Sequence, residues 1–311
     1  MAINQNGDGT RQTPEQRPTQ SRVLFGTLGN DIIRGTVGND TIFGLSGDDF
    51  IDGGAGIDRL YGGTGNDTYV VNSASDQVIE KPNEGIDRVI ANSTSYTLSD
   101  NVENLTLTGK IFNDVPGFFP PQLVGNGNWL NNVIQGSNDS NNLLDGKGGD
   151  DTLIGGNKND NLLGNGGNDA LVGGAGYDTL NGYGTAGRFF LGGILSSVRL
   201  PAPNQDTLTG GTGADTFVLG DTDKSFYIDS SGGRGDRAVI TDFKQFEGDK
   251  IVLHGSAQDY RLEVSSSLGV GTAALDTAIY QGNDLIGIIQ DNVEQSLTSS
   301  SFVYPRISVV R

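Results

Sequence analysis

The chain has 311 residues, with 20 basic and 38 acidic side chains, a formal net charge of −18 and 49 glycines. A negative field of this size repels nucleic acids and anionic membrane surfaces, which excludes both as expected partners. The absence of cysteine excludes disulfides and thiolate metal sites, so an exported chain would need another way to stabilise its fold.

The first 22 residues are polar and hold no apolar stretch. We expect a disordered tail here and no amino-terminal signal peptide. The longest apolar stretch, around residues 189–195, is far too short to span a bilayer. We therefore expect no transmembrane segment.

A period of nine residues begins at Gly26 and reads GTLGNDIIR, GTVGNDTIF, GLSGDDFID, GGAGIDRLY, GGTGNDTYV. Positions 1 and 4 are always glycine, position 6 is always aspartate, and position 8 is always apolar or aromatic. This first repeat block covers residues 23–71. Its position-4 glycines and position-6 aspartates are Gly29, Gly38, Gly47, Gly56, Gly65, Asp31, Asp40, Asp49, Asp58 and Asp67.

Residues 72–126 lose the regular spacing of the glycines, and much of the segment is rich in Val, Ile, Thr and Tyr. We expect further strands in this segment, which continue the coil between two repeat blocks without calcium.

A second block, residues 127–220, becomes regular at Gly146 as GKGGDDTLI, GGNKNDNLL, GNGGNDALV, GGAGYDTLN. An insertion at about 183–203 interrupts the frame, which then resumes as NQDTLT and GGTGADTFV. The in-phase residues of this block are Asp151, Asp160, Asp169, Asp178, Asp206, Asp215, Gly149, Gly167, Gly176 and Gly213. Lys158 replaces one position-4 glycine, and Asn142 stands where an aspartate is expected.

The last three residues of each nine-residue repeat alternate in polarity, which predicts a very short strand. The first six residues contain the glycines and predict a turn. Two nine-residue repeats would form one coil, so equivalent turns stack every eighteen residues. Stacked strands lie about 4.8 Å apart, so the aspartates of successive coils would repel one another without a cation. Oxygen-rich turns favour Ca²⁺, whereas zinc would require more imidazole or thiolate than one histidine and no cysteine provide.

These nonapeptides resemble those of the repeats-in-toxin (RTX) family, G-G-x-G-x-D-x-U-x with a large apolar residue at U. The resemblance implies an all-β fold, a right-handed parallel β-roll or β-solenoid. It also implies Ca²⁺ between the turns, held by the in-phase aspartates and by backbone carbonyls of the glycine turns listed above. Type I secretion machinery as a partner and a secreted, extracellular or cell-surface protein follow from the same resemblance.

Residues 221–311 contain strand-like stretches, among them AVITDF, DKIVL, RLEV, TAIYQ and LIGIIQ. We expect a β-rich carboxy-terminal cap that closes the roll, because a solenoid needs a covered end. The resemblance places a secretion signal in the same region.

The predicted function is calcium binding that drives folding outside the cell. Two alternatives stay open: a calcium-dependent adhesin or surface-layer component, and an accessory module of an enzyme that acts on extracellular polysaccharide. No HExxH or GxSxG motif occurs, and the single histidine, His254, is expected to be structural, so we expect no enzyme.

Overall fold

The computed structural model describes residues 21–110, 122–183, 205–220, 225–227, 236–266, 268, 270–271, 274–293, 296 and 298–305. Within these ranges the chain forms short strands and a single 3-10 turn, η1 (Ala257–Asp259). None of the described segments forms a helix long and apolar enough to span a membrane. The predicted tail over residues 1–22 and the predicted insertion at about 183–203 lie almost entirely outside the described residues.

The chain divides into two compact units, Met1–Ser137 and Asn138–Arg311. The block boundaries predicted above follow the phase of the repeat rather than compactness, and they stay predictions.

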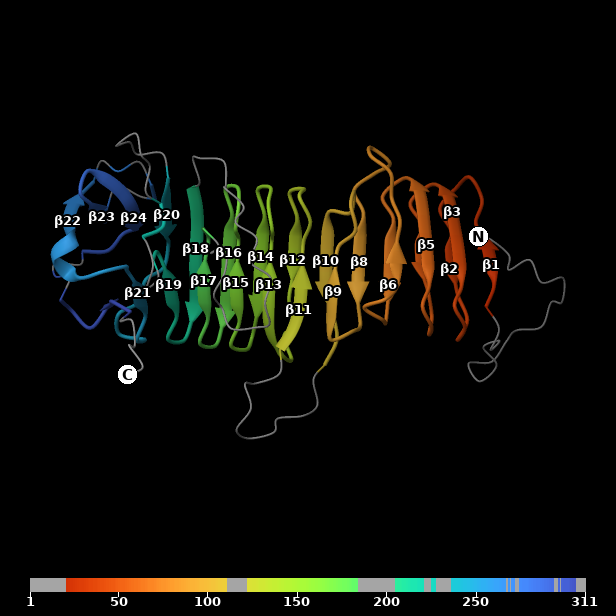
Figure 1. The fold of residues 1–311 in the computed structure, drawn as a ribbon, viewed down its shortest axis with the longest axis horizontal. Helices are drawn as coiled ribbons and strands as arrows, with labels where there is room; N and C mark the ends of the chain where they lie inside the picture. Colours follow the sequence, from red (N-terminus) through yellow and green to blue (C-terminus); the bar gives the residue numbers. More distant parts are fainter. Residues whose placement is uncertain are drawn as a thin grey trace, which may run out of the picture. The chain divides into compact units, whose positions relative to one another are not determined.

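Unit 1 is built from short parallel strands that alternate between two sheet faces (Figure 1). Its strands are β1 (Val23–Phe25), β2 (Ile32–Arg34), β3 (Thr41–Ser46), β4 (Phe50–Asp52), β5 (Arg59–Thr64), β6 (Thr68–Val71), β7 (Gln77–Val78), β8 (Arg88–Ala91), β9 (Ser95–Thr97), β10 (Asn104–Leu107), β11 (Gln122–Asn126) and β12 (Val133–Gln135). Odd strands pair in the order β1-β3-β5-β7, with β9 beside β11, and even strands pair in the order β2-β4-β6-β8-β10-β12.

The register of unit 1 confirms the predicted coil of two nonapeptides. Ile42 on β3 lies beside Leu60 on β5, and Ile51 on β4 lies beside Tyr69 on β6, each pair eighteen residues apart. The segment after the first repeat block stays in the same sheet, because Tyr69 on β6 pairs with Val89 on β8. The predicted strands of residues 72–126 therefore continue the parallel coil.

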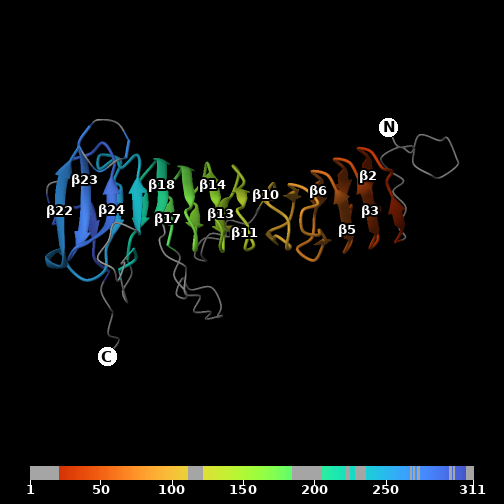
Figure 2. The same cartoon turned by 90° about the horizontal axis from the view of Figure 1, so that it is seen from above.

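Unit 2 repeats this arrangement (Figure 2). Its strands are β13 (Asn141–Asp145), β14 (Thr152–Gly156), β15 (Asn161–Leu163), β16 (Ala170–Ala175), β17 (Thr179–Asn181), β18 (Gln205–Thr212), β19 (Thr216–Val218), β20 (Arg237–Ile240), β21 (Lys250–Val252), β22 (Tyr260–Ser265), β23 (Asp276–Gln281), β24 (Asp284–Ile289) and β25 (Phe302–Val303). Leu171 on β16 pairs with Leu208 on β18, so the register resumes in phase after the insertion.

The carboxy-terminal strands form the predicted β-rich cap. Strands β22, β23 and β24 pair antiparallel, and β24 then joins the parallel sheet through β20. Ala278, Tyr280, Leu285 and Ile288 form a small apolar cluster within this cap.

The interior of both units is a column of position-8 side chains. Ile42, Ile51, Leu60, Leu171 and Phe217 are fully buried. Successive strand residues point to opposite faces, so residues two apart share a face. The position-6 side chain therefore points inward beside the position-8 side chain, and the period of nine places a carboxylate at the edge of an apolar core.

Candidate metal centre

All eleven aspartates predicted as metal ligands are buried. None is more than 3 % exposed, although aspartate is rarely buried without a partner. They are Asp31, Asp40, Asp49, Asp58, Asp67, Asp151, Asp160, Asp169, Asp178, Asp206 and Asp215.

One oxygen of most of these carboxylates joins successive coils. The backbone N–H of Asp31 donates to Oδ1 of Asp49 at 2.8 Å, and the N–H of Asp49 donates to Oδ1 of Asp67 at 2.7 Å. On the other edge, the N–H of Asp40 donates to Oδ1 of Asp58 at 2.7 Å. The structure thus brings the aspartates together in two columns on opposite edges.

The second unit holds the same columns. The N–H groups of Asp151 and Asp160 donate to Oδ1 of the aspartates one coil later, Asp169 and Asp178, at 2.9 and 2.8 Å. The columns also continue past the insertion, because the N–H of Asp178 donates to Oδ1 of Asp215 at 3.0 Å.

The other carboxylate oxygen, Oδ2, is buried without a hydrogen-bond donor from any described residue in most of these repeats. This holds for Asp49, Asp58, Asp67, Asp160, Asp169, Asp178 and Asp215. A buried carboxylate oxygen without a partner is strongly unfavourable, so these atoms call for a ligand.

The backbone of the position-2 residue differs between turns that donate a hydrogen bond to Oδ2 and turns in which Oδ2 has no donor from the described residues. Where Oδ2 has none, position 2 has a positive φ: Leu45 (88°), Gly54 (87°), Gly63 (97°), Gly156 (147°), Asn165 (73°), Gly174 (108°) and Gly211 (101°). In the first two repeats position 2 is threonine, and the N–H groups of Thr27 and Thr36 donate to Oδ2 of Asp31 and Asp40. The left-handed turn thus leaves the carboxylate oxygen available for an ion, and the threonine turn does not.

Backbone carbonyls converge on the same point as Oδ2. A Cβ added at Gly173 would lie 2.5 Å from Oδ2 of Asp178 and 2.6 Å from the carbonyl oxygen of Gly210, one coil later. The missing Cβ at position 1 leaves a space that is lined by carboxylate and carbonyl oxygens. This donor set suits Ca²⁺, which takes six to eight oxygens, so the residues present fit the ion.

The predicted position-4 glycines build the turns. Gly47, Gly56, Gly65, Gly149, Gly167, Gly176 and Gly213 all have φ between 104° and 133°, which favours glycine. Gly29 and Gly38 differ, because their N–H groups donate to the hydroxyls of Thr27 and Thr36. The first two turns therefore differ from the others in conformation.

Burial also makes several aspartates of the columns weaker acids. Desolvation raises the pKa of Asp49, Asp58 and Asp215 to about 6, of Asp67, Asp160, Asp178 and Asp206 to about 7, and of Asp169 to about 8. Neighbouring carboxylates add to this shift for the groups other than Asp160, and a cation would oppose it.

Sequence reasoning missed carboxylates that extend the columns. Asp76 accepts the N–H of Asp58 at 3.0 Å, and Asp87 accepts the N–H of Asp67 at 2.8 Å. Asp249 accepts the N–H of Asp215 at 3.0 Å in the second unit. A signal was present for Asp76, since VNSASDQVI over residues 71–79 keeps Asp at position 6 and Val78 at position 8 without the glycines.

At two positions in the columns a protein side chain donates a hydrogen bond to an aspartate carboxylate. The side-chain amide of Asn142 donates to Oδ1 of Asp160 at 2.8 Å, where an aspartate would repel it. The hydroxyl of Tyr227 donates to Oδ2 of Asp206 at 2.7 Å.

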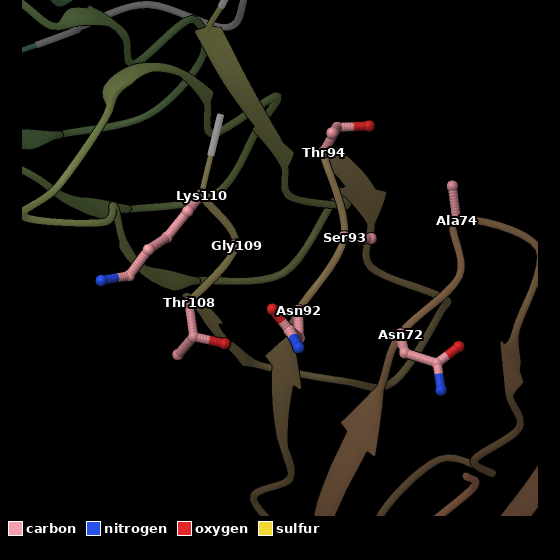
Figure 3. Close-up of a pocket in the computed structure, with 8 residues that line it drawn as sticks. All are labelled: Asn72, Ala74, Asn92, Ser93, Thr94, Thr108, Gly109 and Lys110. Atoms are coloured by element: carbon pink, nitrogen blue, oxygen red, sulfur yellow. The ribbon is translucent and has the colours of Figure 1, made fainter. Parts of the chain in front are cut away.

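A polar pocket lies on unit 1 where the turns after β6, β8 and β10 meet (Figure 3). Its lining residues are Asn72, Ala74, Asn92, Ser93, Thr94, Thr108, Gly109 and Lys110. The Ser93 hydroxyl donates to the carbonyl of Ser95, and the Asn72 amide donates to the carbonyl of Gly54. These contacts support a structural role for the lining, which includes neither a carboxylate nor an imidazole to act as a general base.

Comparison with protein families finds the RTX calcium-binding nonapeptide repeat in four copies, over residues 25–60, 44–78, 145–180 and 204–223. A search of curated proteins gave no match to the chain. The matched ranges contain all eleven predicted aspartates, and the second range also contains Asp76.

Proposed function

Because this chain is an RTX calcium-binding repeat protein, we propose that Ca²⁺ drives its folding after it reaches a calcium-rich compartment outside the cell. The repeats bind Ca²⁺, and proteins that carry them are generally extracellular. Export by a type I machinery that reads the carboxy-terminal region belongs to the same proposal. The chain itself serves a binding and structural role rather than catalysis.

The observation that carries the proposal is the column of buried Oδ2 atoms that receive no hydrogen bond from the described residues. Without an ion, successive coils would place carboxylates close together in an apolar surrounding, which opposes folding. With an ion, each site stabilises the fold by mass action, on the order of 1.4 kcal/mol at a Ca²⁺ concentration ten times the dissociation constant. Several such sites in each unit would decide whether the coils form.

The experiment is a Ca²⁺ titration of the full chain from chelator, followed by far-ultraviolet circular dichroism, with Mg²⁺ in a parallel series. We expect a cooperative gain of β signal that is selective for Ca²⁺. The variant Asp58→Asn should need more Ca²⁺ for the same signal, and the control Asp100→Asn, at an exposed position, should not. A chain that is fully folded in chelator and unchanged by Ca²⁺ would rule the proposal out.

A second candidate, a calcium-dependent adhesin or surface-layer component, is favoured by an aromatic row on one face of unit 1. The rings of Phe25, Phe43 and Tyr61 stack with centroids 5.1 and 4.7 Å apart, and Phe25 is 66 % exposed. Exposed apolar patches often mark association surfaces. Sedimentation in Ca²⁺ should reveal assemblies that Phe25→Ser abolishes, and a monomeric wild-type chain would remove this candidate.

A further inference from the structure

Three buried carboxylates meet in unit 1 where the glycine-containing repeats end. Asp67 precedes β6, Asp87 precedes β8 in the next coil, and Glu80 follows β7 on the way between them. Their exposed fractions are 1 %, 1 % and 7 %. One carboxylate oxygen of each lies within 4.8 Å of the other two.

Each of these carboxylates uses one oxygen for the fold. Oδ1 of Asp67 accepts the N–H of Asp49 at 2.7 Å, and Oδ1 of Asp87 accepts the N–H of Asp67 at 2.8 Å. Oε1 of Glu80 accepts the N–H of Gly62 at 3.1 Å and the hydroxyl of Tyr69. These hydrogen bonds hold the three carboxylates in place and leave the second oxygen of each one for another ligand.

The remaining oxygens, Oδ2 of Asp67, Oε2 of Glu80 and Oδ2 of Asp87, are buried and accept no hydrogen bond from the part of the chain that the structure describes. Lys81, next to Glu80, is turned to the surface, where it pairs with Glu84 at 3.1 Å. Up to three negative charges thus face one another in a buried site without a described basic side chain beside them, which is strongly unfavourable unless a cation binds.

We propose that Asp67, Glu80 and Asp87 bind one divalent cation of the hard, oxygen-preferring class, with Ca²⁺ as the expected ion. The three side chains are all carboxylates, which suit Ca²⁺ better than a metal that prefers nitrogen or sulfur. A proton on one carboxylate would neutralise a single charge and leave the other two facing each other.

This site goes beyond the calcium sites of the repeat turns, although Asp67 also belongs to a repeat. Glu80 begins the unit over residues 80–90, at the place where the nonapeptides carry the position-1 glycine, and therefore adds a third carboxylate that those turns lack. A larger ligand charge generally raises affinity for Ca²⁺. The segment predicted to be free of calcium would thus supply two ligands to a cation.

The test compares the full wild-type chain with Glu80→Gln, which keeps the size of the side chain and its hydrogen-bond acceptor. Glu84→Gln, four residues away and paired with a surface lysine, is the matched control. Bound Ca²⁺ per chain is counted by equilibrium dialysis, and affinities are measured by titration calorimetry. We expect one ion fewer per chain for Glu80→Gln and an unchanged count for Glu84→Gln.

A second measurement separates ion binding from a merely structural role. In chelator, Glu80→Gln should melt no lower than wild type because it removes a buried charge, whereas in Ca²⁺ it should melt lower. If the wild type binds Ca²⁺ and Glu80→Gln binds the same number of ions per chain with the same affinities, this site alone is overturned. A wild-type chain that binds no Ca²⁺ would instead overturn the proposed function, and this site with it. Asp87→Asn should reproduce the loss of one ion if Glu80→Gln does not fold.

Discussion

The hydroxyl of Tyr227 donates a 2.7 Å hydrogen bond to Oδ2 of Asp206, and in most other repeats no described residue donates to this oxygen. Tyr227 is fully buried, and its ring meets Tyr183 edge to face at 5.5 Å between centroids. A side chain from outside the repeat thus occupies the place where an ion is expected.

This contact predicts that Asp206 matters less for calcium than Asp215, whose Oδ2 has no donor in the part of the chain that the structure describes. Asp206→Asn should lose fewer bound ions than Asp215→Asn, because the Tyr227 hydroxyl already occupies the place of an ion at Asp206. Equilibrium dialysis of Ca²⁺ on the two variants measures the difference. Equal losses would show that Tyr227 leaves the site when calcium binds.

The stability of the chain in chelator should fall as pH rises. Burial disfavours the charged form of several aspartates and raises the pKa of Asp49 to about 6, of Asp67 to about 7 and of Asp169 to about 8, from 3.8 for the ordinary side chain. The folded chain therefore binds more protons than the unfolded chain between pH 4 and 8, and its stability decreases across that window.

Saturating Ca²⁺ should reverse this dependence, because protons and the ion compete for the same oxygens. We expect a higher melting temperature at pH 5.5 than at pH 8 in chelator, and the opposite order in Ca²⁺. Melting curves in the two media at both pH values check this. The same order in both media would contradict a shared site for protons and calcium.

Leu45 is a leucine at a position that needs a left-handed backbone. Its φ is 88°, close to the 97° of Gly63 at the equivalent place one coil later, and its side chain is 42 % exposed. Leu45→Gly should raise stability in Ca²⁺ by about 1 kcal/mol, because the strain exceeds the small loss of apolar contact. Thermal or urea unfolding measures the change.

The reciprocal change, Gly63→Ala, is the control for Leu45→Gly. It should destabilise the chain, because an added Cβ would collide with the carbonyl oxygen of Leu45. A loss of stability in Leu45→Gly would mean that the leucine side chain contributes more than its exposure indicates.

Asn142 allows a test of how an added carboxylate in the columns affects stability with and without Ca²⁺. Its backbone N–H and side-chain amide both donate to Oδ1 of Asp160, at 2.7 and 2.8 Å. Asn142→Asp should lower the melting temperature in chelator, since the swap exchanges a hydrogen bond for repulsion, at a cost of about 1–3 kcal/mol. Ca²⁺ should restore most of that loss. In Asn142→Ala, which adds no charge, Ca²⁺ should restore none.

The repeat itself could be predicted in detail. A period of nine with aspartate at position 6 and an apolar residue at position 8 places both side chains inward on a short strand, as Asp49 and Ile51 show. Two such units close one coil, so the pairing of Ile42 with Leu60 follows from the period alone. The alternation of side chains along each strand and the nine-residue period are both visible in the sequence, so no long-range contact is needed to predict them.

The continuation of the columns was harder to predict, because its signals are weak. Asp76 keeps the phase without glycines, and Asp87 lies twenty residues after Asp67 rather than eighteen. A changed spacing hides the equivalence until the strands pair, as Tyr69 and Val89 do.

The sequence by itself determined the class of fold, the strand period and the set of in-phase carboxylates, because each follows from residues within one repeat. Only the tertiary structure decided which carboxylate oxygens lack a donor, since that depends on the backbone at position 2 and on distant side chains. Tyr227 reaches Asp206, and Glu80 joins Asp67 and Asp87, through coil stacking between residues with no common period. Such contacts form only when the coils stack, so no local pattern encodes them.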